Sequence, residues 1–240
     1  MMTFPLIFMI REPKVKKLPN PEPVAKVNRM LTLTKEVMLE IRQKPKYIFV
    51  FICSMVSRLM NILFAVYVQL WVMSFQKSGV LASKEQSDKT YRDIVIWMQI
   101  ATLTAMPIFG YYSDKGDPRI MIPLTFLARG TVACSFRFID DPQTVEARLL
   151  AVCLTVTSII QFLSVEVLFM RNMKSTIRGT LYGIAFFFGC AGSTLFVYVG
   201  GILFDKVAPW APFMVVGVSD FAVIVFALVF IFFGLLKRDD

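Results

Sequence analysis

The stretch that decides the fold runs from residue 211 to residue 236 and reads APFMVVGVSDFAVIVFALVFIFFGLL. Asp220 is its single charged residue. About 20 mostly apolar residues are enough for a helix to cross roughly 30 Å of hydrocarbon. Inside a bilayer every backbone hydrogen bond must be made within the protein, and a helix makes them within one segment. The stretch therefore predicts a membrane-spanning helix.

Five similar stretches precede it, which predicts an all-α, polytopic membrane bundle of six transmembrane helices over residues 47–240. The composition agrees, since 56% of the 240 residues are hydrophobic and the mean hydropathy is +0.63. An ordinary soluble domain is about 45–50% apolar, so a soluble enzyme and a disordered chain are excluded. The five stretches are Tyr47–Phe75, Ile94–Tyr112, Ile120–Ile139, Val145–Met170 and Leu181–Phe204.

The distribution of Lys and Arg predicts the orientation of the bundle. With both termini in the cytoplasm, the cytoplasmic segments carry 17 of the 26 Lys and Arg residues and 8 of the 17 Asp and Glu residues. The net charge of +9 then lies on that face, as the positive-inside rule requires. A basic surface beside anionic lipid headgroups accounts for this charge. We therefore expect the lipid bilayer as a partner and no nucleic acid.

The residues that usually carry enzyme or metal chemistry are scarce. The chain has no His, and its four Cys residues lie in predicted spans without C-x-x-C spacing. We interpret them as small packing residues. The sequence thus predicts no enzyme activity, no metal and no cofactor. The four are Cys53, Cys134, Cys153 and Cys190.

Residues 1–46 form a separate predicted segment, a cytoplasmic linker with a helix stub and an amphipathic helix. Phe4–Ile10 is apolar but lacks the basic start and cleavage site of a signal peptide, so we interpret it as the end of a membrane helix whose beginning is missing. Lys14–Pro23 is predicted as an extended linker. The helix that follows either lies on lipid headgroups or packs on the base of the bundle. Its apolar stripe is Val27, Met30, Leu31, Thr34, Met38 and Ile41.

A short pattern occurs twice, at the same place in each half of the predicted bundle. Residues 110–118 and 201–209 both read Gly-x-x-x-Asp-Lys-x-x-Pro. The first copy follows the second span on the cytoplasmic side, and the second copy follows the fifth span on the outer side. Two inverted three-helix repeats would produce this arrangement.

The first copy resembles the cytoplasmic loop motif of the major facilitator superfamily. Gly110, Asp114, Lys115 and Arg119 match that motif, whereas residues 117 and 118 depart from it. Arg178-Gly179, the glycine-rich fifth span and Gly200–Asp205 are similar to the eleventh helix of the family. The six predicted spans then resemble helices seven to twelve, the C-terminal half of the fold.

The resemblance implies secondary active or facilitative transport of a small solute by alternating access between two six-helix halves. A lone half needs an N-terminal six-helix half, supplied upstream in the same gene product or by a separate chain. The alternative is a non-transporting structural membrane subunit of a larger complex built on the same fold.

Polar residues inside the spans are the candidate cavity residues, because polar groups at membrane depth are costly and usually functional. Ser54, Arg58, Asn61, Ala65 and Gln69 form one stripe on the first span. The resemblance places this helix beside the central cavity, so Arg58 either contacts an anionic substrate or a gating carboxylate, or makes a structural ion pair. The other candidates are Gln99 and Thr102 on the second span and Gln161 on the fourth, with interhelical hydrogen bonds as the alternative reading.

The predicted cytoplasmic gate contains Gly110, Asp114, Lys115, Arg119, Glu166 and Arg171. Asp114 is expected to cap a helix N-terminus, and Glu166 to pair with one of the three cations. Pairs that form in only one state would bias the equilibrium between outward-facing and inward-facing forms. A static surface pair is the alternative.

Arg129 and Asp220 lie near the middle of otherwise apolar spans. They are predicted to pair with each other, or Asp220 with Arg58, and proton coupling through Asp220 is the second possibility. On the fifth span, the small residues Ala185, Gly189, Gly192 and Ser193 are predicted to let a neighbouring helix approach closely.

Overall fold

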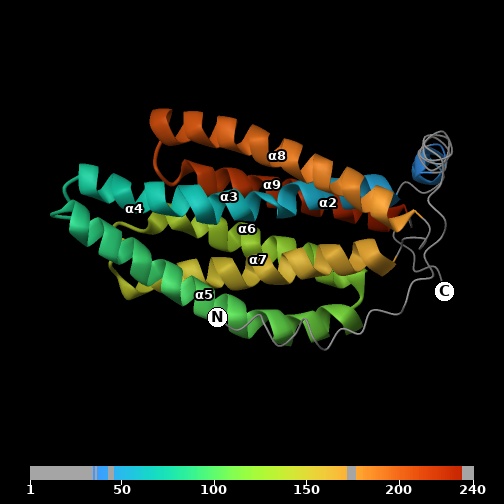
Figure 1. Cartoon of the computed structure of the whole chain (residues 1–240), viewed down its shortest axis with the longest axis horizontal. Coiled ribbons are helices and arrows are strands. Elements are labelled where there is room, and N and C mark those ends of the chain that lie inside the picture. The colour runs from blue at the N-terminus through green and yellow to red at the C-terminus, as the bar shows by residue number, and fades with distance from the viewer. Residues whose placement is uncertain (1–34, 36, 43–45, 172–176, 234–240) are drawn as a thin grey trace, which may run out of the picture.

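The computed structural model describes residues 35, 37–42, 46–171 and 177–233, which form a bundle of helices without a strand (Figure 1). The all-helical fold class is thereby confirmed. The elements are α2 (Lys46–Ser57), α3 (Leu59–Ile62), the π-helical turn η1 (Leu63–Tyr67), α4 (Val68–Lys77), α5 (Lys84–Lys115), α6 (Pro118–Ser135), the 3-10 turn η2 (Phe136–Phe138), α7 (Val145–Arg171), α8 (Arg178–Lys206) and α9 (Ala211–Phe232).

Five helical segments of the described chain are long and apolar enough to cross a membrane. They are Tyr47–Lys77, Lys84–Lys115, Val145–Met170, Arg178–Lys206 and Ala211–Phe232. Helix α6 stands at the place of the third predicted span but is not among these five. It has only 18 residues, which include Arg119, Arg129 and Pro123, and these lower its mean hydropathy. The sixth span therefore stays a prediction.

The first of these segments is an irregular helix built from α2, α3, η1 and α4. Arg58 stands between α2 and α3, where the Asn61 amide donates to the Arg58 carbonyl at 3.3 Å. In the turn η1, the Val68 amide donates back to the Leu63 carbonyl. Such π turns occur as single insertions in α-helices, often at functional sites. The irregular part of the span thus surrounds the candidate residues Arg58 and Asn61.

The packing of the helices has a regular plan. Helix α6 packs on α9, α5 packs on α7, and α8 packs on α2. Helix α6 also contacts α7, as α9 contacts α2. The first three helical segments (α2–α4, α5, α6) and the last three (α7, α8, α9) therefore contact each other in a matched way. The contact of α5 with α7 corresponds to that of α8 with α2, and the contact of α6 with α7 corresponds to that of α9 with α2. In Figure 1, α5 and α8 lie on opposite sides of the bundle, with α2–α4 and α7 between them.

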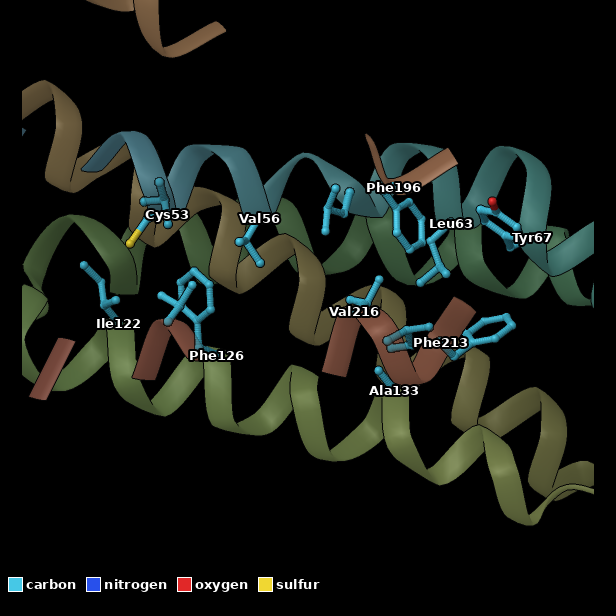
Figure 2. Packing of buried hydrophobic residues seen from close by; sticks show 14 of the residues in the cluster. Cys53, Val56, Leu63, Tyr67, Ile122, Phe126, Ala133, Phe196, Phe213 and Val216 are labelled. Carbon is cyan, nitrogen blue, oxygen red and sulfur yellow. The ribbon is translucent and has the colours of Figure 1, made fainter. Parts of the chain in front are cut away.

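The buried core lies where the first span, α6 and α9 meet (Figure 2). Toward one end, Trp71 of α4 contacts Phe136 of η2 and Phe213 of α9, with ring centroids 5.3 and 6.1 Å apart. Phe136 and Phe213 stack with their ring centroids 4.2 Å apart. This aromatic cluster fixes the register of α4 against α9.

Most of the N-terminal segment falls outside the described residues, including Phe4–Ile10, Lys14–Pro23 and the start of the amphipathic stripe. Residues 37–42 are helical. Val37 is buried and belongs to the core cluster, whereas Met38 of the predicted stripe is exposed. Ile41 of the stripe packs against the same cluster, so the buried face of this short stretch contains Val37 and Ile41 but not Met38.

Helices α6 and α9 approach closely at Gly130 and Gly217. A Cβ at Gly217 would lie 2.5 Å from the Cys134 Sγ atom and 2.9 Å from the Gly130 carbonyl oxygen. Backbone atoms cannot be moved aside as a flexible side chain can. This crossing therefore requires glycine at residue 217.

We expect Gly217→Ala to destabilise the bundle by about 1–3 kcal/mol, because the added methyl group overpacks the α6–α9 crossing. Thermal unfolding of the purified protein in detergent measures the effect. Gly201→Ala is the matched control, since a Cβ there meets nothing within 4 Å. Equal unfolding temperatures for the two variants would contradict the close approach.

Candidate functional site

A mostly apolar groove of about 640 Å³, with a few polar side chains, runs between α3 and α8. The α3 side contributes Asn61 and Ile62, with Arg58 directly before the helix. The α8 side contributes seven residues along four turns: Phe186, Gly189, Cys190, Ser193, Thr194, Val197 and Tyr198. The groove thus combines a cation, hydroxyl and amide groups, and an apolar wall.

The side chain of Arg58 lies across α8 at Gly189. A Cβ at residue 189 would overlap the Arg58 Cδ atom, so the glycine makes room for this side chain. The Arg58 Nε group donates to the Ser54 hydroxyl at 3.4 Å, and that hydroxyl donates to the Ala185 carbonyl at 3.4 Å. The guanidinium carbon lies 4.8 Å from the centre of the Phe186 ring. The small residues of α8 therefore let the first span approach closely and also leave space for the Arg58 side chain.

Arg58 also makes an ion pair with Glu166 of α7, a residue that does not itself line the groove. Its Nη2 atom lies 3.5 Å from the Glu166 Oε1 atom of α7. The two side chains are 12% and 21% exposed. Tyr182 of α8 interacts with the same carboxylate. Both side chains are therefore partly accessible, and one long contact joins them.

The partner of Glu166 differs from the prediction, which proposed Lys115, Arg119 or Arg171. The side chains of Arg119 and Arg171 lie outside the described residues, and Lys115 contacts Tyr111 on its own helix. A helical wheel gives the direction of a side chain on its own helix but not the neighbour it meets. The sequence feature that pointed toward this pair was the polar stripe with Arg58, because an arginine inside a span needs a carboxylate or another anion as its partner.

A second ion pair is sealed inside the bundle. The Arg129 Nε group of α6 donates to Asp220 Oδ2 of α9 at 2.7 Å, and its Nη2 group donates to Asp220 Oδ1. The same Nη2 group donates to the Val56 carbonyl of α2 at 3.3 Å. The Gln161 amide of α7 donates to Asp220 Oδ1 at 3.1 Å. One bidentate pair thus joins four helices.

This network accounts for three candidate residues. Arg129 and Asp220 meet each other, which is the first of the two pairings that the sequence suggested. Gln161 was predicted to line a cavity, but its side chain is fully buried. Interhelical hydrogen bonding, the alternative reading, describes Gln161 in this structure.

The other cavity candidates are spread over two helices. Asn61 lines the groove, whereas Gln69 is half-buried and does not. Gln99 is exposed and Thr102 is half-buried on α5, away from the groove, and the Thr102 hydroxyl donates to the Met98 carbonyl at 2.9 Å.

The remaining gate residues lie at the end of α5. A Cβ at Gly110 would meet nothing within 4 Å, so no close approach requires glycine there. Asp114 is exposed in the last turn of α5 and has no partner among the described side chains. The helix cap predicted for Asp114 stays a prediction.

Five helical segments that are long and apolar enough to cross a membrane define a multi-pass integral membrane protein. The chain belongs to the Major Facilitator Superfamily, whose family model matches residues 1–197. Members of this family are transporters rather than enzymes.

A curated relative is the magnetosome protein MamH of Paramagnetospirillum magneticum. It is 26% identical to this chain over 132 residues, which are 55% of the chain and 23% of the relative. The match therefore spans about a quarter of that protein's length. No solved structure matches the chain.

We expect Arg129→Met and Asp220→Asn each to destabilise the protein by about 3–5 kcal/mol, because each leaves one buried charge without its partner. The double variant leaves no buried charge, so it loses much less than the sum of the two single losses. Unfolding in detergent by titration with SDS measures all three. Additive losses would show that the two charges do not depend on each other.

Proposed function

We propose that the chain is the C-terminal six-helix half of a transporter that moves a small solute by alternating access, in facilitated or secondary active transport. It would act with an N-terminal half, from the same gene product or a separate chain. Family membership and the order of the motifs support this assignment. The exchange of packing partners between the two three-helix units is what an inverted repeat would produce.

The groove beside Arg58 carries the proposal. It contains a cation and several polar side chains on two helices that are long and apolar enough to span a membrane, and such groups are costly at membrane depth unless they serve a function. Helices α5 and α8 have the smallest buried share of the five candidate spans, 22% each. Their open faces suit a second six-helix unit that would close the groove into a cavity.

The proposed topology places both termini and the motif 110–119 in the cytoplasm. This orientation puts the charge of +9 on one face. Helix α6 would complete the six spans, with its arginine neutralised inside the protein by Asp220. In this setting the chain binds and moves its solute without a covalent reaction.

A structural membrane subunit on the same fold is the second candidate. The observation in its favour is that Arg58 already has Glu166 and Phe186 as partners, so the groove contains no cation free of protein contacts. In such a subunit, lipid or another protein would fill the groove.

Cys190 distinguishes the two candidates, because it lines the groove and is exposed. In a variant with Cys190 as its only thiol, we expect a charged, water-soluble thiol reagent to react in native membranes. A variant that keeps only Cys153, which is exposed on α7 outside the groove, is the control. Reaction of Cys190 with a lipid-soluble reagent alone would favour the structural subunit.

We expect Gly189→Ala to lower solute uptake about as strongly as Arg58→Gln, because its Cβ displaces the Arg58 side chain. Uptake is measured in cells that produce the chain together with its N-terminal half. Gly183→Ala on the same helix is the control, since a Cβ there meets nothing within 4 Å. Unchanged uptake kinetics in Arg58→Gln would exclude a substrate role for Arg58.

A further inference from the structure

The carboxylates Asp220 and Glu166 both interact with an arginine inside the bundle, and their surroundings differ. Asp220 is fully buried and accepts three hydrogen bonds from Arg129 and Gln161. Glu166 is partly exposed and faces Arg58 across 3.5 Å. An incoming solute can reach and replace only the second of these ion pairs. Glu166 is therefore the carboxylate whose partner can change during transport.

The groove next to Arg58 selects a class of solute. Arg58 and the Ser193 hydroxyl suit a small anionic group, whereas the Thr194 hydroxyl already donates to the Cys190 carbonyl at 3.0 Å. Ile62, Val197 and the ring of Phe186 form an apolar wall in the same groove. A small organic anion with an apolar body matches both parts.

The charge balance of the site determines what must accompany such an anion. Arg58 and Glu166 together carry no net charge. An anion that takes the place of Glu166 at Arg58 would leave an unpaired carboxylate at membrane depth, which is costly. One proton on Glu166 restores the neutral site. A neutral solute would need no such proton.

On the basis of the proposed transport function, we propose that the groove binds a monovalent organic anion at Arg58, and that Glu166 leaves Arg58 and takes up one proton for each anion bound. The contact between Arg58 and Glu166 breaks, a contact between Arg58 and the anion forms, and the proton comes from water. The chain would therefore couple anion transport to protons through Glu166 and not through Asp220.

Charged and titratable groups on the neighbouring helices support this assignment. Among the described side chains, Arg58 and Tyr182 interact with Glu166. Lys115 of α5 contacts Tyr111, and Arg129 of α6 is committed to Asp220. Tyr182 can keep a hydrogen bond to Glu166 after Arg58 has turned to the anion.

Benzoate tests the proposal, with benzyl alcohol as the neutral probe of the same shape. The chain is purified together with its proposed N-terminal half, with Cys190 as the only thiol of the complex. The complex is titrated in weakly buffered detergent solution that contains a pH-indicator dye. We expect benzoate, but not benzyl alcohol, to slow the labelling of Cys190 and to cause uptake of about one proton per anion bound. Glu166→Gln is expected to bind benzoate without proton uptake, whereas Glu85→Gln, an exposed control outside the groove, behaves as the wild type.

Arg58→Gln is expected to lose benzoate binding, and Arg58→Lys, which keeps the charge, to retain binding together with proton uptake. Benzoate binding without proton uptake in the wild type, or proton uptake that persists in Glu166→Gln, would overturn the coupling. Absence of benzoate protection would overturn the anion class. In each case, the proposed transport function is judged separately. It is supported if Cys190 still reacts with the charged reagent, and it is contradicted if only the lipid-soluble reagent reacts.

Discussion

The structure depends on the ion pair between Arg129 and Asp220. It lies between α6 and α9, and the Gln161 amide of α7 and the Val56 carbonyl of α2 add hydrogen bonds from two further helices. A buried charge is tolerated only while its partner stays in place, so these four helices are held in one relative arrangement. Helices α5 and α8, which contribute no group to the network, are the two with the most open faces.

The bundle therefore contains two ion pairs with different consequences. The pair of Arg129 is bidentate, buried and held by further hydrogen bonds to two other helices, which suits a rigid body. The pair of Arg58 is a single long contact between two partly exposed side chains. The helices joined by Arg129 and Asp220 thus suit the part of the molecule that keeps its shape. The Arg58–Glu166 pair suits the part where a solute can replace one partner.

Hydropathy predicted the helical bundle well because the bilayer requires long apolar helices and leaves few other solutions. The same measure is weak for α6, because the arginine that anchors the core also lowers the hydropathy of its helix. The partner of Glu166 could not be predicted, because Arg58 and Glu166 are 108 residues apart in the chain and meet only through the packing of their two helices. Gln161 was misplaced for a related reason: a polar face on a helix looks the same whether it meets a cavity or a buried charge.

The π turn at Leu63–Tyr67 joins two parts of one helix that have different tasks. Arg58 and Asn61 before it face the groove, and Trp71 after it packs in the aromatic cluster with Phe136 and Phe213. Such a turn holds one residue more than an α turn, and one residue corresponds to a rotation of about 100°. Deleting a single residue here would leave a regular helix but turn either the arginine out of the groove or the tryptophan out of the core. The number of residues in this turn is therefore under as strong a constraint as their identity.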